Sequence, residues 1–322
     1  MTISTFMEKH FRHFNAREAL AAAKAFKKLV DQDNGAMLVS LAGAMSTAEL
    51  GVSLAEMIRN GKVHAISCTA ANLEEDLFNL FAHDEYKVIE NWRALSVDDE
   101  IALLNAGYNR VTDTCIPETV MKHMQSRLVK YWSQAAKEGK SYFPYEFMFM
   151  LLDEPDLKPF YKIPVEHSWM MAAKNAGIPV FSPGIEDSTL GNMFAARVMD
   201  GTVSSHHALK SGTHQLERLA NWYRDISKDR DIGFFQIGGG IAGDFAVCVV
   251  PMLIQDLDEP NTRRWAYFAQ ISDSDTSYGG YSGAVPNEKI TWNKLTADSP
   301  KFMIQSDATI VAPLIFAYVL GQ

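Results

Sequence analysis

Apolar residues come in short, nearly continuous runs along this chain, and each run ends in small or acidic residues followed by a helix-like pattern. The clearest runs are predicted as β-strands at residues 37–41, 62–67, 178–181, 233–237, 265–271 and 302–305. Strands without polar alternation are typical of a parallel sheet that is covered on both faces. The pattern therefore predicts an α/β fold, with a mostly parallel sheet and helices on both of its faces.

The segments that follow these runs share a composition that suits ligand binding. They are rich in Gly, Ala, Ser and Thr, which let a ligand approach the main chain, and in Asp and Glu, which can hold hydroxyl or ammonium groups. Ligands of open α/β sheets bind outside the carboxyl ends of the strands. We therefore expect these segments to gather into one site.

The remaining pattern bears on domain organisation. Residues 1–33 are predicted as a helical N-terminal extension, with Asn15 and Glu18 resembling an N-cap pair. Residues 85–165 are less regular, and 143–155 are interpreted as an insertion. The apolar run 308–320 is predicted as a strand-to-helix core element, too short to span a bilayer. No repeat or linker divides the chain, so a single domain over residues 1–322 is expected.

Composition narrows the partners and the compartment. A formal net charge of −9 disfavours nucleic acid and suits cationic ligands. The three cysteines, Cys68, Cys115 and Cys248, form no C-x-x-C pair, which disfavours disulfides and zinc and suits a reducing compartment. The N-terminus lacks a basic start followed by an apolar core. A cytoplasmic protein that binds neither membrane nor nucleic acid is expected.

Three motifs are ambiguous on spacing alone. Residues 238–243 satisfy G-x-G-x-x-G directly after a predicted strand, which fits either a pyrophosphate-binding turn or a Gly-rich packing turn. Residues 74–76, Glu-Glu-Asp, are placed at a helix start, where the helix dipole favours acids whether or not they have a function. His206, His207 and His214 lack metal-ligand spacing, so no metal is expected.

Residues 279–294 carry the most informative chemistry. A Gly-rich turn leads into Glu288, Trp292 and Lys294. A lysine buried beside an aromatic wall and a carboxylate can act as an amine nucleophile, because burial favours its unprotonated form. The alternative is a solvated lysine on a surface loop, which the spacing by itself favours.

The pattern Ser-Gly-Ala-x-Pro-x-Glu-x-x-x-Trp-x-Lys at residues 282–294 resembles the active-site segment of deoxyhypusine synthases. The resemblance covers nearly the whole chain and is most specific at residues 69–76, 180–191, 238–240 and 282–294. It implies a Rossmann-like fold that binds NAD at the strand ends, in a homotetramer with active sites at dimer interfaces. In that family the lysine at the place of Lys294 forms a covalent imine with an aminobutyl group.

Carried over residue by residue, the resemblance implies two groups of site residues. The NAD pocket would use Ala42, Gly43, Ser46, Thr69, Ala70, Ala71, Glu75, Asp187, Gly239, Ser272, Asp273, Asp307 and Ala308. The amine site would use Glu74, Asn192, Asp244, Tyr281, Glu288 and Trp292, with Lys294 as the catalytic residue. The matches at residues 42–46 and at Ser272 and Asp273 are positional more than identical.

Three amine-site positions depart from the deoxyhypusine-forming enzymes. Asn192 and Tyr281 stand where those enzymes carry aspartate, and Asp244 stands where they carry histidine. Because charged hydrogen bonds are worth about 1.5–3 kcal/mol each, the rearrangement is expected to change the preferred amine. We expect retained aminoalkyl transfer between free amines, namely putrescine, spermidine or agmatine, as in a homospermidine-type synthase. The alternatives are a strict deoxyhypusine synthase that modifies a protein lysine, and an NAD-binding protein without transferase activity.

Overall fold

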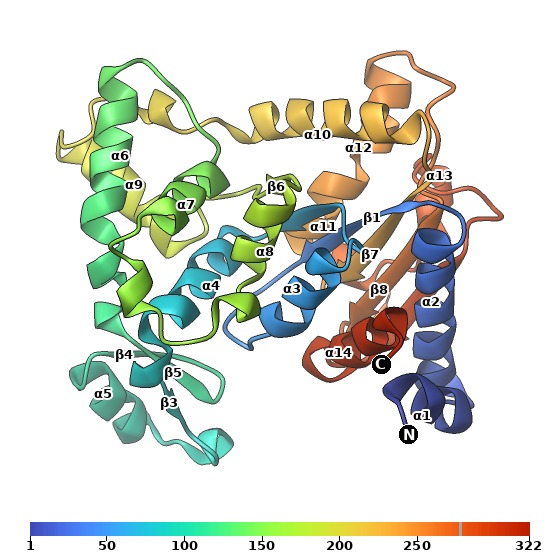
Figure 1. The fold of residues 1–322 in the computed structure, drawn as a ribbon, viewed down its shortest axis with the longest axis horizontal. Helices are drawn as coiled ribbons and strands as arrows, with labels where there is room; N and C mark the ends of the chain where they lie inside the picture. Colours follow the sequence, from blue (N-terminus) through green and yellow to red (C-terminus); the bar gives the residue numbers. More distant parts are fainter. Residues whose placement is uncertain (277–278) are drawn as a thin grey trace.

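The computed structural model describes residues 1–276 and 279–322 (Figure 1). Its main sheet has six parallel strands in the order β6-β2-β1-β7-β8-β9. The strands are β1 (Ala36–Leu41), β2 (Ala65–Cys68), β6 (Val180–Phe181), β7 (Ile232–Ile237), β8 (Tyr267–Ser272) and β9 (Lys301–Gln305). Each strand overlaps one of the predicted runs and extends at most one residue beyond it, which confirms the α/β fold and the parallel sheet. The strand order is that of dinucleotide-binding sheets, with its reversal between β1 and β7.

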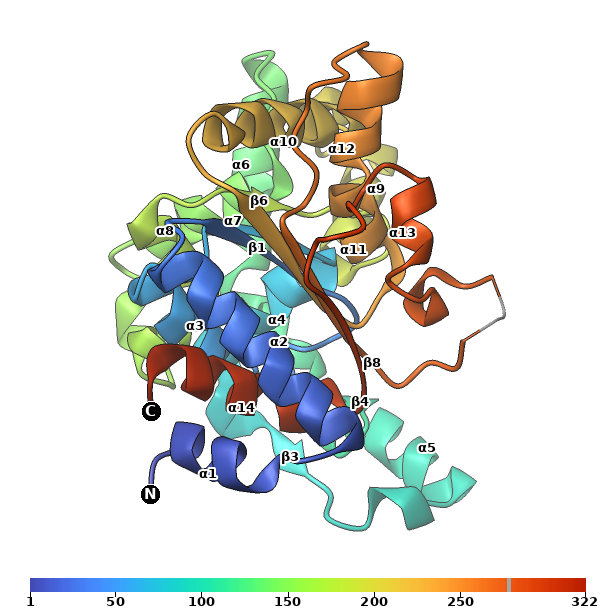
Figure 2. The ribbon, with the colours of Figure 1, turned by 90° about the vertical axis from the view of Figure 1, so that its right-hand side faces the viewer.

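Helices cover both faces of this sheet (Figure 2). The first face carries α2 (Phe14–Asp31), α3 (Gly51–Arg59), α8 (Trp169–Ala176) and α14 (Ala308–Leu320), and α1 (Ile3–His10) packs against α14. The second face carries α10 (Gly212–Ser227), α11 (Gly240–Val247) and α12 (Val249–Pro251), which continues into the π-helical turn Met252–Asp256. Alternate residues of β1 show why both faces are apolar, since Met37 and Val39 join one core cluster while Ala36 and Leu38 join the other.

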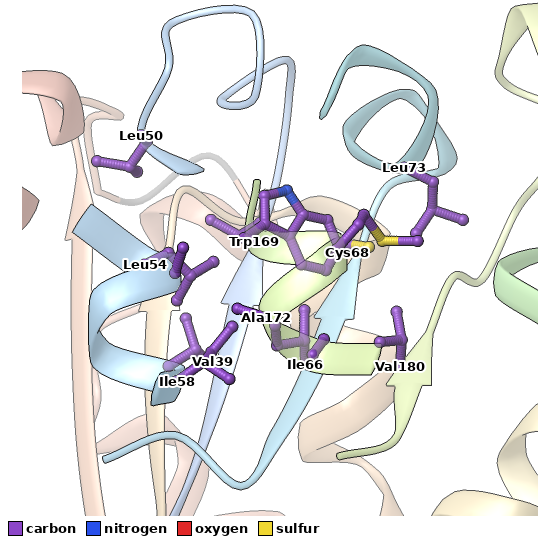
Figure 3. Packing of buried hydrophobic residues seen from close by; sticks show 14 of the residues in the cluster. Val39, Leu50, Leu54, Ile58, Ile66, Cys68, Leu73, Trp169, Ala172 and Val180 are labelled. Atoms are coloured by element: carbon purple, nitrogen blue, oxygen red, sulfur yellow. The ribbon is translucent and has the colours of Figure 1, made fainter. Parts of the chain in front are cut away.

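On the first face, α3 and α8 pack side by side over β1, β2 and β6 (Figure 3). The contact is made by Leu54 and Ile58 of α3, Trp169 and Ala172 of α8, and Val39, Ile66 and Val180 of the strands. The buried Trp169 indole also donates to Ser46 Oγ at 3.0 Å. Its only polar group is therefore satisfied, and α8 is tied to the loop that follows β1.

The chain between β2 and β6 builds a second group of elements. Its helices are α4 (Ala70–Ala82), α5 (Val97–Asn105), α6 (Gln125–Lys137) and α7 (Pro144–Asp153). A small antiparallel sheet has the strand order β3 (Lys87–Val88), β5 (Thr114–Pro117) and β4 (Tyr108–Val111). Helix α9 (Thr189–Met199) follows β6. The stretch 143–155, interpreted as an insertion, forms α7, which contacts α4, α6 and α8. Phe147, Met148 and Leu151 of α7 are fully buried, so this segment belongs to the core.

Two local predictions at the ends of the chain are wrong. Residues 308–320 are entirely helical as α14, and the strand before them is β9. Asn15 and Glu18 do not cap a helix, because α2 already begins at Phe14. Their side chains instead bond the main chain of β9, at Gln305 and Met303. An edge strand leaves main-chain groups unpaired, and this pair satisfies some of them.

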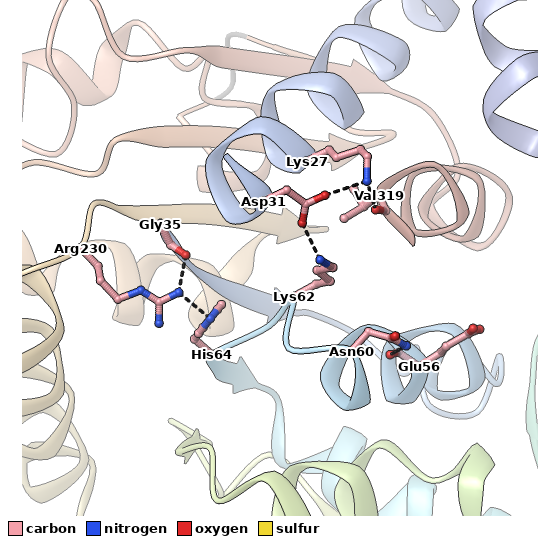
Figure 4. A network of polar contacts seen from close by, with 9 residues as sticks. All are labelled: Lys27, Asp31, Gly35, Glu56, Asn60, Lys62, His64, Arg230 and Val319. Carbon is pink, nitrogen blue, oxygen red and sulfur yellow. Dashed lines mark hydrogen bonds and ion pairs between the residues drawn. The ribbon is translucent and has the colours of Figure 1, made fainter. Parts of the chain in front are cut away.

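Polar contacts tie the elements together at the amino ends of the strands (Figure 4). Asp31 pairs with Lys27 of its own helix and with Lys62 before β2. Arg230 donates to the Gly35 carbonyl and contacts His64. Burial, together with the charges of Arg230 and Lys62, lowers the pKa of His64 to about 4. The small-residue loops lie at the opposite end of the sheet, where the strands have their carboxyl ends.

Across the described parts of the chain, no helix combines the length and the apolarity that crossing a bilayer requires.

Candidate active site

A cavity of about 810 Å³ opens at the carboxyl ends of β1, β7, β8 and β9. It lies where the strand order reverses, which is the place where open α/β sheets bind ligands. Of the residues assigned to the cofactor pocket from the sequence, the cavity brings together Ala42, Gly43, Ser272, Asp273, Asp307 and Ala308. Four separate loops thus meet at one place.

The cavity has the features that a dinucleotide requires. Its volume falls in the range of about 300–1,000 Å³ usual for ligand sites. Small residues at 42–44 leave the main chain open to a ligand, while Asp273 and Asp307 add carboxylates that can accept from ribose hydroxyls. Asp307 also caps α14, because its Oδ1 accepts from Thr309 N at 2.8 Å. The residues present therefore fit NAD.

The small antiparallel sheet and the short 3-10 turn Trp92–Ala94 before α5 also line this cavity. Trp92 and residues 111–114 line it, and none of them was assigned from the sequence. Thr112 has a φ of 52°, so the turn between β4 and β5 is sharply bent at the cavity. The irregular pattern of residues 85–165 held no signal for this role, since only the packing of the small sheet brings the wall to the strand ends.

Three other residues assigned to the cofactor shape the loop after β1 and do not line the cavity. Ser46 bonds Asn72 through both its amide and its hydroxyl, at 2.8 and 3.0 Å. Thr69 donates to the Gly43 carbonyl at 2.7 Å, and Glu75 accepts from Thr47 N at 3.2 Å. Their contacts hold residues 43–47 in place. Asn72, which the sequence reasoning missed, is the centre of this arrangement.

The remaining assigned cofactor residues lie around these loops. Ala70 and Ala71 begin α4, directly after Thr69. Asp187 is exposed in the turn before α9, where its amide donates to the Gly184 carbonyl at 3.0 Å. Gly239 lies in the turn after β7, next to Gly238, which lines the cavity.

Glu74, Glu75 and Asp76 were predicted at a helix start. The structure instead places them further along α4, which begins at Ala70, and buries all three. Glu74 accepts from the amides of Thr189 and Leu190 at the start of α9, at 3.1 and 2.7 Å. Asp76 does the same for Trp169 and Met170 at the start of α8. Burial raises the pKa of Glu74 to about 7, of Glu75 to about 8 and of Asp76 to about 7. Glu74 and Asp76 therefore each hold the first turn of a neighbouring helix.

The second gathering of assigned residues surrounds Lys294. This lysine is only 6% exposed, which excludes the solvated-lysine alternative. Its Nζ lies 3.2 Å from Asp244 Oδ1 and 5.7 Å from the ring centroids of both Tyr281 and Trp292. Glu288 is exposed at the first residue of α13 (Glu288–Thr291). The structure thus places a buried amine between a carboxylate and two aromatic rings.

The Gly-rich turn after β7 allows this arrangement. A Cβ at residue 239 would overlap Ser282 Oγ and lie 2.6 Å from Ser282 Cα. A Cβ at residue 243 would lie 3.0 Å from the Tyr281 ring. Tyr281 donates to Gln236 Oε1 of β7 at 2.7 Å, and Gln270 of β8 donates to the Ser282 carbonyl at 2.6 Å. These close contacts support the packing-turn interpretation, while Gly238 also borders the cavity.

Two residues that the sequence reasoning missed lie against Lys294. Cys248 Sγ is 3.3 Å from Asp244 Oδ1, and burial raises the pKa of this thiol. The i, i+4 spacing of Asp244 and Cys248 was the signal that could have found it. Lys289 is 2% exposed, and burial lowers its pKa to about 8. An isolated lysine in the sequence gives no such signal, because its burial is decided by β8 and Tyr281.

The residues predicted to bind the amine form two groups in the described part of the chain. Glu74 and Asn192 lie with α4 and α9, and within residues 1–276 and 279–322 no hydrogen bond or ion pair joins them to the Lys294 group. Trp292 beside Lys294 is 62% exposed, and Ile241 on α11 is 52% exposed. Within the described residues these two groups of predicted amine-site residues thus share no polar contact, and the Trp292 ring beside Lys294 is exposed.

In the residues that the structure describes, no group of three or more His, Cys, Asp or Glu side chains is placed to hold a metal ion. His206 lies against the Phe194 ring, and His214 belongs to the capping box of α10.

Comparison with known proteins agrees with this architecture. A deoxyhypusine synthase-like protein of Nostoc sp. (strain PCC 7120) is 28% identical over 333 residues, which cover 100% of this chain and 82% of the relative. A probable deoxyhypusine synthase 1 of Archaeoglobus fulgidus is 27% identical over 318 residues, covering 96% and 90%. The crystal structure of a putative deoxyhypusine synthase from Entamoeba histolytica has the same fold, with a TM-score of 0.59 at 12% identity, over 100% of this chain and 94% of the other.

The family model for deoxyhypusine synthase matches residues 5–319, which is nearly the whole chain. The match includes the strand-end cavity and the Lys294 segment. The chain therefore belongs to the deoxyhypusine synthase family, whose members are NAD-dependent transferases of an aminobutyl group.

Proposed function

We propose that this protein transfers an aminoalkyl group between free amines through an imine on Lys294, with a homospermidine-type product. The observation that carries the proposal is the environment of Lys294. A lysine that is 6% exposed, with one carboxylate at 3.2 Å and two aromatic rings beside it, supports a role as a nucleophile over that of a surface charge.

When bound, NAD would supply the hydride acceptor that converts the donor amine to an imine and, at the end, the hydride donor that reduces the product imine. The neutral amine of Lys294 attacks the resulting imine carbon and forms a new C–N bond. The old C–N bond breaks, and the leaving amine departs with a proton. An acceptor amine then displaces Lys294 from the same carbon, so the whole reaction is redox-neutral.

The residues around Lys294 have distinct roles in this scheme. Asp244 Oδ1 is close enough to exchange a proton with Lys294 Nζ, and its side chain is half exposed, so an incoming ammonium group can also reach it. The exposed face of Trp292 offers an apolar wall for the aliphatic chain of the amine. Tyr281 is held by Gln236 and closes the site on the side of β7.

The choice of free amines rests on the distribution of charge. Asn192 and Tyr281 carry no charge, whereas Asp244 supplies a carboxylate directly at Lys294. A carboxylate there suits a terminal ammonium or, through two oxygens, a guanidinium. The names of the relatives favour the main alternative, in which the acceptor is a protein lysine. The second alternative is an NAD-binding protein that has lost transfer.

We further propose a single-domain chain that assembles as a cytoplasmic homotetramer with its active sites between subunits. The separation of Glu74 and Asn192 from the Lys294 group supports a shared site, because a second subunit can bring the two halves together. The exposed Trp292 ring beside Lys294 is apolar surface of the kind that interfaces cover.

The test is mass spectrometry of the products formed with NAD and, separately, putrescine, spermidine and agmatine. A new secondary amine without net NADH is expected from at least one of them. Replacing Lys294→Ala should abolish the product while NAD binding, measured by calorimetry, is unchanged. Lys24→Ala, on the exposed surface of α2, is the matched control and should keep full activity.

Each other outcome is informative. A fully active Lys294→Ala variant would end the imine proposal. No product with any free amine, but mass added to a lysine of an acceptor protein, would establish the deoxyhypusine alternative. Steady release of NADH would show a plain dehydrogenase instead.

A further inference from the structure

Lys289 is a second buried lysine at the Lys294 site, and its surroundings are unusual for a cation. In the described residues the only hydrogen bond of its side chain is to the Ala284 carbonyl, at 3.4 Å. Its Nζ lies 4.6 Å from the ring centroid of Phe268 and 5.1 Å from that of Tyr281. Among residues 1–276 and 279–322, no carboxylate lies within ion-pair distance of it. Buried lysines usually have such a partner, so this one calls for a functional explanation.

Tyr281 brings the two lysines close to each other. Lys289 Nζ is 5.1 Å and Lys294 Nζ is 5.7 Å from the centroid of the same ring. Both side chains are almost fully buried, so water screens their charges less than it would at the surface. The charge of Lys294 is one of the causes that lower the pKa of Lys289, so the two ammonium groups are near enough to oppose each other's protonation.

Asp244 has the opposite influence on Lys294. A carboxylate at 3.2 Å stabilises the ammonium form, which has no lone pair and cannot attack a carbon atom. The site therefore needs a second influence if Lys294 is to be both held by Asp244 and available as a free amine. Of the other charged or titratable groups near the pair, Glu288 is exposed on α13, while Cys248 and Tyr281 have pKa values raised by burial and stay neutral.

We propose that Lys289 is a positioning residue whose charge offsets Asp244 and keeps a larger share of Lys294 as the neutral, nucleophilic amine. The inference rests on the proposed role of Lys294 in transfer. Lys289 itself is held by the Ala284 carbonyl and by the faces of Phe268 and Tyr281. These contacts stabilise a cation that is placed too deep to meet substrate.

The charge is available at neutral pH. Burial is the main cause that lowers the pKa of Lys289, to about 8, and the charge of Lys294 is the next cause. Below that pH most molecules carry the Lys289 proton. The effect on Lys294 is expected to fade as the pH rises through 8.

The experiment follows the reactivity of Lys294 and does not require turnover. The full-length protein is acetylated briefly with acetic anhydride between pH 6 and 10, and the extent at Lys294 is read by peptide mass spectrometry. Replacing Lys289→Met removes the charge with little change in length. We expect the Lys294 profile to move to higher pH by about half to one unit, with labelling at pH 7 falling roughly three- to tenfold. Lys24, exposed on α2, reports in the same sample and should not move.

Two further variants make the result decisive. Lys289→Gln is also neutral and should reproduce the shift if the Met variant folds poorly, while Lys289→Arg retains the charge and should restore the original profile. An unchanged Lys294 profile in a folded neutral variant, or the same shift in the Arg variant, would overturn the inference. A shift in labelling in a protein that forms no amine product would support the electrostatic role and reject only the proposed transfer reaction.

Discussion

Gly239 sets how closely the Lys294 segment can approach the sheet. Ser282 occupies the space where a Cβ of residue 239 would lie, with its Oγ at 2.0 Å and its Cα at 2.6 Å from that position. Ser282 is next to Tyr281, whose hydroxyl bonds Gln236 and whose ring lies beside Lys289 and Lys294. A single hydrogen in place of a methyl group thus decides the position of the aromatic wall.

The first prediction concerns this contact. Replacing Gly239→Ala should push the turn at Tyr281–Gly283 outward, lower the stability by about 1–3 kcal/mol and reduce transfer strongly. Gly280→Ala is the control, since a Cβ there meets nothing within 4 Å and its φ is −73°. Chemical denaturation and product formation measure the two effects. If the two variants had the same stability and the same rate of product formation, the close contact between Gly239 and Ser282 would not be required for either.

At the scale of elements, α4 is the part of the molecule that joins the sheet to the outer helices. Glu74 and Asp76 accept from the first amides of α9 and α8, and Glu75 accepts from the loop after β1. Carboxylates at the positive ends of helix dipoles are favourable, but burial removes them from water. Hydrogen bonds lower the pKa values of these three carboxyl groups and burial raises them. Burial has the larger effect, so all three pKa values are raised.

A pH dependence of stability follows from these shifts. The pKa of Glu75 rises from 4.5 to about 8 on folding, so between these values the folded protein binds a proton that the unfolded chain has lost. The stabilisation is complete below pH 4.5 and is lost as the pH rises through 8. His64 acts in the opposite direction between about pH 4 and 6.5, and Lys289 does so above pH 8. The range from pH 6.5 to 8 therefore isolates the carboxylates.

In that range the free energy of unfolding should fall by about 2 kcal/mol as the pH rises. Denaturant titrations at pH 6.5 and 8 measure the change. Glu75→Gln keeps an acceptor for Thr47 N and should make the dependence less steep, with the remainder due to Glu74 and Asp76, whereas the exposed Glu217→Gln on α10 should leave it intact. A rise in stability over this range would contradict the assigned direction.

At the scale of the whole molecule, the residues predicted to bind the amine come from two groups of elements. Asn192 and Glu74 lie on the α4–α9 side, and Lys294 lies with α11 and α13 (Figure 1). One chain already forms the strand-end cavity, whereas no polar contact joins the two groups of amine residues within residues 1–276 and 279–322. The proposed assembly would bring these two groups together.

Mixing two inactive variants tests this division. Asn192→Arg places a repelling charge on an exposed helix position, and Lys294→Ala removes the nucleophile, so each assembly alone should be inactive. Subunits co-expressed in equal amounts should recover about a quarter of the activity, because a quarter of shared sites then have both halves intact. Each variant carried through the same procedure alone is the control. Mixed assemblies, verified by native mass spectrometry, that stay inactive would place the site within one chain.

The sequence by itself determined the sheet and much of the cofactor end. Continuous apolar runs are required wherever a strand is covered on both faces, so β1, β7 and β8 were visible without any tertiary information. The carboxyl ends of parallel strands meet at one edge, which predicted that the small and acidic residues after them gather into one site. The individual residues, such as Asp273 and Asp307, were assigned through the resemblance to deoxyhypusine synthases, and the cavity contains both. The segment around Lys294 was recognised by its pattern, which is local in the chain.

Only the tertiary structure decided what depends on contacts between distant segments. Asn15 and Glu18 have the pattern of a helix cap, yet they bond β9 because the sheet edge lies beside them. The wall formed by Trp92 and the burial of Lys289 each depend on elements far away in the chain. Hydrophobic periodicity records which side of an element is buried, but it does not record which element covers it, and charge balance at Lys294 is set by the covering element.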